Sequence, residues 1–214
     1  MHILFQDHVM KNWTAILPSR EIKADTQSLG AFASAYIADQ ELRSRIAEKL
    51  WFDILVHYLE FGIDPMEIVD TIKNLEAGEP HNGVKPATEF TRQPLKGLWH
   101  KHYFTARFLP ANISLALGKN GLKDTVEAIL DPVKYPVITP EAIEELAHAV
   151  VSLPVEKRDA DGKITGEWVI FAKHEGRNYY LSMAIHTTPD QVIYDNVMEH
   201  STRTFPELKS WLPA

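Results

Sequence analysis

The sequence predicts an α+β fold, with a helical N-terminal half, then a C-terminal helix and a roughly four-stranded antiparallel β-meander. Apolar residues recur every three or four positions over residues 27–77, as in helices that pack on one face. After residue 150, runs of β-branched and aromatic residues alternate with Gly/Asp turns, as in antiparallel strands. With 214 residues, 45% of them hydrophobic, the chain can build one large domain or two small ones.

Three regions are expected along the chain. Residues 1–80 form a helical region, residues 81–139 a linker with a basic helical segment, and residues 140–214 an antiparallel sheet region. The last two are expected either as separate units or as one continuous domain. Residues 78–97 contain three prolines and three glycines, a composition typical of a long loop.

The first helices have clear boundaries. Gly62 is suited to end a helix, because glycine readily adopts the left-handed conformation. Asp64 can cap the next helix with Pro65 at its first position, and that helix is expected to end near Gly78. His57 lies inside the apolar pattern and is predicted to be a packed histidine rather than a catalytic one.

Shorter elements are expected beyond the loop. Helices are predicted over 97–108 and 122–130, and Pro110 prevents one continuous helix between them. Thr139 and Pro140 predict a further helix over 140–150. Four strands then follow, with the sequences VVSLPVEKR, ITGEWVIFAK, NYYLSMAIHT and QVIYDNV.

The third of these strands has a predicted face of smaller side chains. Alternation places Tyr180, Ser182, Ala184 and His186 on one face of the sheet. That face is less bulky than the opposite one, so a groove is expected there.

Composition and motifs exclude several classes of protein. The chain has no cysteine, which removes disulfides, thiolate metal sites and cysteine nucleophiles. It shows no secretory leader and no apolar run long enough to span a bilayer, so a cytoplasmic protein without a membrane partner is expected. No phosphate-binding loop, dinucleotide fingerprint, nucleophile elbow or zinc-protease motif occurs, and no cofactor is expected.

Charge is distributed unevenly. The net charge is −7, yet residues 91–123 contain six Lys and Arg and no acidic residue. Such a segment can attract a phosphate-bearing partner if its side chains face water. The alternative is that acidic helices neutralise these charges within the fold.

Histidines are the candidate catalytic groups, since their pKa lies near physiological pH. His100 and His102 lie in the basic segment, and on the predicted helix they point in different directions, so no metal site is expected. His174 and Arg177 flank a predicted turn, where they could bind a phosphate. His186 ends the next strand, roughly 27 Å from that turn at about 3.4 Å per residue, so His174 and His186 cannot share one phosphate in a regular hairpin.

The stretch GEWVIFAKHEGRNYYLSMAIHT, after a predicted helix, resembles the barnase–EndoU–colicin–RelE group of small ribonuclease toxins, including phage- and plasmid-associated members. The resemblance covers residues 140–214. It implies metal-independent RNA cleavage by attack of the 2′-OH group, with His186, His174, His100 and His102 as candidate acids and bases. The expected substrate-binding residues are Lys96, Lys101, Arg107, Lys173, Arg177, Tyr180, Ser182 and Thr187.

A non-enzymatic binding protein is the alternative. An immunity, inhibitor or adaptor protein could use the acidic helical half to bind a basic partner. The expected partner is therefore RNA in the first case, and a toxin or another protein in the second. If the chain is itself a toxin, a cognate antitoxin is expected.

Overall fold

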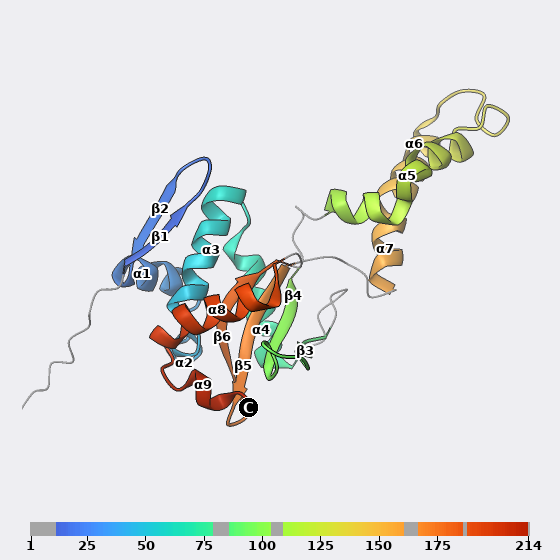
Figure 1. The fold of residues 1–214 in the computed structure, drawn as a ribbon. Helices are drawn as coiled ribbons and strands as arrows, with labels where there is room; N and C mark the ends of the chain where they lie inside the picture. Colours follow the sequence, from blue (N-terminus) through green and yellow to red (C-terminus); the bar gives the residue numbers. More distant parts are fainter. Residues whose placement is uncertain (1–11, 79–85, 104–108, 161–166, 186–187, 214) are drawn as a thin grey trace, which may run out of the picture.

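The computed structural model describes residues 12–78, 86–103, 109–160, 167–185 and 188–213. The fold is α+β, and an antiparallel sheet with the strand order β3-β4-β5-β6 lies at its centre (Figure 1). Its strands are β3 (Thr88–Glu89), β4 (Leu98–Tyr103), β5 (Glu167–His174) and β6 (Arg177–Ala184). A separate antiparallel hairpin is formed by β1 (Asn12–Ile16) and β2 (Glu21–Asp25).

Four N-terminal helices lie on one side of the sheet. They are α1 (Thr26–Tyr36), α2 (Gln40–Ser44), α3 (Glu48–Phe61) and α4 (Pro65–Ala77). Helices α3 and α4 pack directly against the sheet. Leu50, Ile54 and Ile72 of these helices are buried in one apolar cluster with Val169 and Phe171 of β5. This cluster is the larger of the two cores, and it fixes α3 against the sheet.

The C-terminal helices cover the opposite face. They are α8 (Asp190–His200), the short 3₁₀ helix η3 (Ser201–Arg203) and α9 (Leu208–Trp211). Ile193 and Val197 of α8 pack with Ile170 and Leu181 of the sheet in the second core. The central unit is therefore a three-layer arrangement of helices, sheet and helices.

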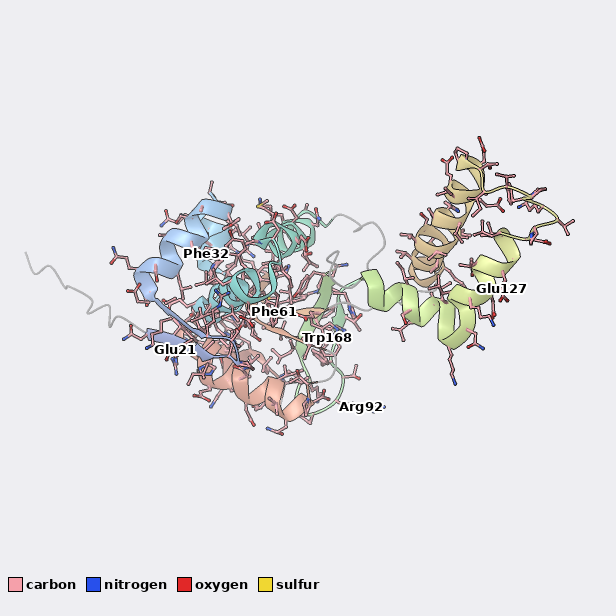
Figure 2. The ribbon with its side chains drawn as sticks, turned by 90° about the horizontal axis from the view of Figure 1, so that it is seen from above. Glu21, Phe32, Phe61, Arg92, Glu127 and Trp168 are labelled. Carbon is pink, nitrogen blue, oxygen red and sulfur yellow. The ribbon has the colours of Figure 1, made fainter. Side chains whose placement is uncertain are left out.

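Residues 109–160 form a helical arm that stands out from this unit in Figures 1 and 2. It consists of α5 (Leu109–Ile129), α6 (Pro140–Ala147), the π-helical η2 (His148–Ser152) and α7 (Leu153–Ala160). The elements of the arm pack on one another. The arm is inserted between β4 and β5, two neighbouring strands of the sheet. No helix in the described ranges combines the length and apolar character needed to cross a membrane.

Several predicted boundaries are confirmed. Gly62 ends α3 in the left-handed conformation with φ 66°, and Gly78 ends α4 in the same way. Asp64 caps α4 by accepting a hydrogen bond from the Met66 backbone N–H, with Pro65 at the first position. Thr139 caps α6 through the Ala142 backbone N–H. The predicted turn after the second strand also occurs, and it joins β5 to β6.

Three predicted elements are wrong. Residues 98–103, expected in a helix, form strand β4 instead, because they pair with β5. The first and fourth predicted strands are helical: the first lies largely in η2 and α7, and the fourth lies in α8. The four-stranded sheet therefore takes β3 and β4 from residues 88–103. The β1–β2 hairpin also interrupts the expected helical N-terminal half.

The predicted face of the third strand is broken by a β-bulge in β6. Ile170 pairs with Ser182 and Phe171 pairs with Tyr180, so Leu181 is an extra residue. As a result Tyr180 and Met183 lie in the core under α3, while Ala184 packs on the other side of the sheet. The expected shared face of Tyr180 and Ala184 is therefore incorrect.

Candidate active site

A stripe of polar side chains runs along α3 toward the sheet. Lys49, Asp53 and His57 are four residues apart, so they follow one another on one face of the helix. Apolar neighbours such as Leu50 and Ile54 are fully buried and fix the orientation of α3. Lys49 is itself only 8% exposed. Charged groups at this depth require partners, since burial of an isolated charge is costly.

Asp53 organises the centre of the stripe. Its carboxylate forms an ion pair with Lys49 and accepts a 3.0 Å hydrogen bond from the Met183 backbone N–H. In the described part of the sheet, β6 is an edge strand. Residues 45–47 pair with it through two backbone hydrogen bonds, both 2.8 Å, at Tyr180. Asp53 thus accepts a hydrogen bond from the Met183 N–H on the open edge of β6, and its carboxylate also positions the Lys49 ammonium group.

His57 is held at both ring nitrogens. Nδ1 lies 2.8 Å from the Asp53 backbone carbonyl oxygen, and Nε2 lies 2.9 Å from Glu167 Oε2. A carbonyl oxygen can only accept, so Nδ1 carries a hydrogen. One further proton must then lie between Nε2 and Oε2, because two acceptors cannot form this second bond.

Electrostatics favour the charged imidazolium. Burial alone would lower the pKa of His57, but the hydrogen bond to Glu167 and the Glu167 charge outweigh it, with a smaller contribution from Asp53. The net effect is a pKa raised above the usual 6.5. The raised pKa favours the imidazolium–carboxylate form of the His57–Glu167 pair, whose side chains are 16% and 17% exposed.

Glu167 is oriented by Tyr103. The two residues are register partners on β5 and β4. The Tyr103 hydroxyl donates a 2.8 Å hydrogen bond to Glu167 Oε2, the same oxygen that bonds His57. Burial, followed by the Glu167 charge, raises the pKa of Tyr103 strongly. Tyr103 therefore stays a neutral hydrogen-bond donor.

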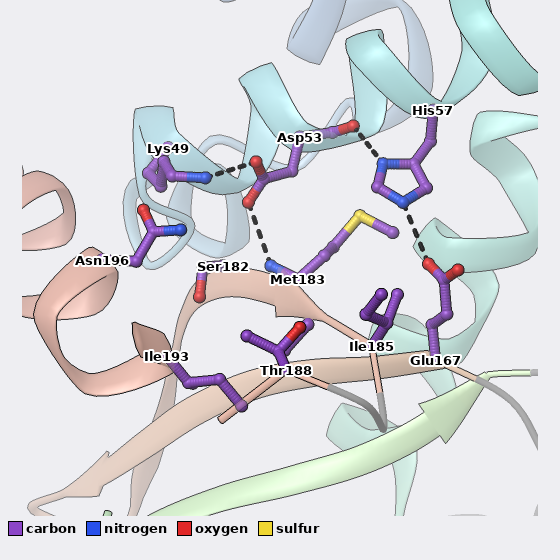
Figure 3. Close-up of a pocket in the computed structure, with 11 residues that line it drawn as sticks. Lys49, Asp53, His57, Glu167, Ser182, Met183, Ile185, Thr188, Ile193 and Asn196 are labelled. Carbon is purple, nitrogen blue, oxygen red and sulfur yellow. Dashed lines mark hydrogen bonds and ion pairs between the residues drawn. The ribbon is translucent and has the colours of Figure 1, made fainter. Parts of the chain in front are cut away.

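Lys49, Asp53, His57 and Glu167 line a cavity of about 190 Å³, named here the pocket (Figure 3). His57 and Glu167 lie at one end, and Lys49 and Asn196 lie at the other. The remaining lining residues are Ser182, Met183, Ala184, Ile185, Thr188 and Ile193, together with Asp53. The pocket thus combines a shared proton at one end with the Lys49 ammonium group at the other. That combination can transfer a proton and stabilise an anion in the same reaction.

His100 and His102, predicted on a helix, lie on strand β4 and on the same face of it. Their rings are 5.6 Å apart, and both contact Trp168. The Trp168 indole N–H donates a 3.2 Å hydrogen bond to His102 Nε2. His100 also packs 4.5 Å from Phe90. The two histidines belong to an aromatic cluster that shares no lining residue with the pocket.

The basic segment is divided between two parts of the fold. Lys101 is only 4% exposed, and burial lowers its pKa. Lys96 lies in the turn before β4, and Arg107 lies outside the described residues. Lys119 and Lys123 lie on the arm, where Lys123 is 3.6 Å from Glu127. Figure 2 shows Arg92 beside the central unit and Glu127 on the arm, far from each other.

The residues predicted around the β5–β6 hairpin are also dispersed. His174 stacks on Trp211 at 4.7 Å, Lys173 lies over the Trp99 ring, and Arg177 pairs with Glu41 at 2.9 Å. Tyr180 is fully buried and donates a 2.7 Å hydrogen bond to Glu76. Ser182 lines the pocket. His186 and Thr187 lie outside the described residues, but in sequence they fall between Ile185 and Thr188, which both line the pocket.

Sequence reasoning missed the main residues of the pocket. Lys49, Asp53 and His57 form a polar period of four on an otherwise apolar helix, and this pattern could have identified them. Glu167 could not be paired with His57 from sequence, because the contact spans 110 residues. Among the described residues, no cluster of three His, Asp or Glu is arranged to bind a metal ion.

No family model, curated protein or solved structure matches this chain.

Proposed function

We propose that the protein cleaves RNA without a metal ion, by acid/base chemistry in the pocket. The observation that supports this most is the 2.9 Å hydrogen bond between His57 Nε2 and Glu167 Oε2, in the same pocket as Lys49. The sequence resemblance to small ribonuclease toxins points to the same reaction. Glu167, the acidic partner of His57, lies in the GEWVIFAK stretch that carries this resemblance.

In this reaction the 2′ oxygen forms a bond to the adjacent phosphorus, and the bond from phosphorus to the 5′ oxygen breaks. The proton of the 2′-OH group passes to a base, and the 5′ oxygen receives a proton as it leaves. The His57–Glu167 pair holds one proton between two basic groups, so it can accept the first proton and supply the second. Lys49 stabilises the additional negative charge on the phosphorane.

The test is RNA cleavage by the purified protein in the presence of EDTA. Products ending in a 2′,3′-cyclic phosphate are expected. His57→Gln and Glu167→Gln should each lower the rate about 10²- to 10⁴-fold, the range typical of general acid–base groups. His174→Gln is the matched control, since His174 stacks on Trp211 away from the pocket. Intact RNA at high protein concentration, or a fully active His57→Gln variant, would refute the proposal.

His186 remains a candidate for the second acid or base. Its neighbours Ile185 and Thr188 line the pocket. We expect His186→Ala to lower the rate of RNA cleavage, whereas His100→Gln should leave it close to wild type. Equal losses from both variants would favour the basic segment over the pocket as the site.

A second candidate function is protein binding without catalysis, and the arm favours it. Large apolar side chains are exposed along the arm, including Val133, Val137, Ile138 and Ile143. Single exposed apolar residues are common, but this many on one unit are typical of an interaction surface. The nearby acidic residues Glu141 and Glu144 suit a basic partner.

This candidate is tested by isolating a stoichiometric complex from the native host. Ile143→Glu should abolish the complex. Lys119→Glu, also on the arm, serves as the control for a simple change of charge. A complex that survives Ile143→Glu would exclude this surface of the arm as the binding site.

A further inference from the structure

Three neutral polar residues line the pocket together with its charged groups. They are Ser182 of β6, Thr188, which lies just before α8, and Asn196 of α8. Figure 3 shows Asn196 and Ser182 at the same end of the pocket as Lys49. Proton transfer by the histidine–glutamate pair uses none of the three, so they give the pocket a further capacity for hydrogen bonding.

The charged and the neutral residues of the pocket differ in how far their hydrogen bonds are satisfied. Lys49 forms an ion pair with Asp53, and His57 is hydrogen-bonded to Glu167. Within the described residues, by contrast, the side chains of the three neutral residues form no hydrogen bond. A ligand can therefore bond to these three groups without breaking a contact of the fold.

The hydroxyl group of Ser182 is the strongest indication of a ligand. Ser182 is only 2% exposed, and its backbone is fixed by pairing with Ile170 of β5. Burial of a hydroxyl group without a hydrogen bond is costly, and most buried polar side chains in proteins have a partner. Since Ser182 lines the pocket, a polar group bound there would supply the missing hydrogen bond.

Asn196 supplies a donor and an acceptor side by side. It lies three residues after Ile193 on α8, so the two side chains fall on the same face of the helix, and both line the pocket. The Asn196 carboxamide has one carbonyl oxygen and one NH₂ group. These can bond at the same time to a donor and an adjacent acceptor, which is the pattern that the edge of a nucleobase presents.

The remaining walls of the pocket are apolar and suit a flat, uncharged ring. They are formed by Met183, Ala184, Ile185 and Ile193. Met183 is 8% exposed and Ile193 is 3% exposed, so the packed core holds both in place. Small-molecule sites usually combine such walls with a few polar groups and enclose about 300–1,000 Å³. At about 190 Å³ the pocket is smaller, which favours a one-ring base over a two-ring base.

We propose that the Lys49 end of the pocket binds one base of the RNA strand, a pyrimidine in preference to a purine. Asn196 and Ser182 form hydrogen bonds with the edge of the base, and the apolar walls contact its faces. The inference rests on the proposed function for the identity of the ligand as RNA. Asn196 then determines specificity, because a base that left its carboxamide or the Ser182 hydroxyl group unpaired would bind less tightly.

The experiment measures binding of the base apart from cleavage. Uridine, cytidine, adenosine and guanosine carry no phosphate, so each can be titrated into isotope-labelled protein without being cleaved. Two-dimensional NMR follows the Asn196 side-chain amide and the Met183 backbone amide. We expect the two pyrimidine nucleosides to bind more tightly than the two purine nucleosides, with equal affinity at low and high salt because the contacts are neutral. N3-methyluridine, which lacks the N3 hydrogen, should bind about tenfold more weakly than uridine.

Two variants and one control test the residues of the base site. Asn196→Leu keeps a side chain of similar size but removes both hydrogen-bonding groups, and it should weaken uridine binding about tenfold. Ser182→Ala should weaken uridine binding about threefold. Because the Ser182 hydroxyl group has no partner within the described residues, this variant should also leave the urea midpoint of unfolding unchanged or raise it. Asn120→Leu is the matched control and should bind uridine like wild type, since Asn120 is exposed on the arm.

Cleavage assays test whether the base site acts in the reaction. On an RNA of mixed sequence, wild-type protein should cut mainly at pyrimidines, and Asn196→Leu should lose most of that preference while its rate at purines changes little.

The outcomes separate this inference from the proposed activity. The inference would be overturned, even if RNA is cleaved, if no nucleoside shifts either amide signal at millimolar concentration. Equal losses of binding in Asn196→Leu and Asn120→Leu, or RNA cleavage without base preference, would overturn it as well. Pyrimidine binding that is lost in Asn196→Leu, without RNA cleavage by wild type, would support the base site and refute the proposed activity.

Discussion

Tyr103 and Glu167 face each other across β4 and β5, and the Tyr103 hydroxyl donates a 2.8 Å hydrogen bond to the oxygen that also bonds His57. A residue of the sheet interior thereby fixes the acidic member of the candidate catalytic pair. Because every residue of β4 pairs with a residue of β5, the position of Glu167 depends on the register of the sheet.

Tyr103→Phe should therefore remove the hydrogen bond that orients Glu167 while keeping the aromatic ring, so that no cavity forms in the core. We expect the free energy of unfolding to fall by about 1.5–3 kcal/mol, as for the loss of a hydrogen bond to a charged group. RNA cleavage should fall less than in Glu167→Gln. Urea denaturation and the cleavage assay measure the two effects. A variant as inactive as Glu167→Gln would assign Tyr103 a direct role in the chemistry.

The pKa values of His57 and His200 should be shifted in opposite directions from 6.5. The pKa of His57 is raised above 6.5 mainly by Glu167, against the effect of burial, whereas burial lowers the pKa of His200 below 6.5. Two-dimensional NMR of the imidazole resonances measures both values, with His57→Gln and His200→Gln providing the assignments. A His57 pKa below that of His200 would contradict the described geometry.

These shifts also affect stability. Protonated His57 stabilises the fold fully below pH 6.5, and this contribution is lost as pH rises through its raised pKa. His200 acts in the opposite sense: its contribution is present above pH 6.5 and is lost as pH falls through its lowered pKa. The unfolding free energy of His57→Gln should therefore decline less than that of wild type above pH 6.5.

Arg45 links the edge of the sheet to α4. It is 7% exposed, pairs with Glu41 and Glu76, and donates a 2.9 Å hydrogen bond to the Asn178 carbonyl oxygen. Glu76→Gln removes the charge that pairs with Arg45, and we expect a loss of about 2–4 kcal/mol in chemical denaturation. Glu41→Gln should cost less, since Glu41 is 54% exposed. A larger loss in Glu41→Gln would contradict this assignment.

Gly97 is required by the packing of the C-terminus. Its φ is 88°, and a Cβ atom there would overlap the ring of Pro213. Gly97→Ala should lower the unfolding free energy by more than the about 1–3 kcal/mol expected from backbone strain alone. Gly62→Ala is the matched control, because Gly62 has φ 66° and open space around its Cα. Equal losses in thermal unfolding would show that the Pro213 contact is unimportant.

The sequence predicted the elements whose pattern is local. The boundaries at Gly62, Asp64 and Thr139 follow from capping chemistry, which involves only neighbouring residues, and all three are confirmed. The β5–β6 hairpin also follows from local alternation and a turn.

The fourth strand was predicted wrongly because the residue types of its sequence were given more weight than the spacing of its apolar residues. The stretch QVIYDNV is rich in strand-forming residues, but Ile193 and Val197 are spaced four apart and face the sheet from α8. Strand β4 was missed for another reason. Its partner is β5, and the whole arm separates the two in sequence.

The candidate site was the least predictable part of the molecule. Histidines in the basic segment were chosen because they lie among cations, yet the fold directs His100 and His102 into an aromatic cluster. The side chain of His57 is 16% exposed, as expected of a packed histidine, but the proposed function gives it the catalytic role that the sequence did not. Its pairing with Glu167 depends on the placement of α3 over β5, and only the tertiary structure provides that placement.

The insertion of the arm has a consequence for how the chain folds. Tyr103 and Glu167 are the last and first residues of adjacent antiparallel strands, so the ends that residues 104–166 connect are already within hydrogen-bonding distance. Strands β4 and β5 can pair only when the loop of residues 104–166 has closed. Closing a long loop has an entropic cost, so we expect this pairing to be a slow step of folding. The ends of β4 and β5 are close enough for a tight turn to connect them. The arm is therefore not needed to join the two strands.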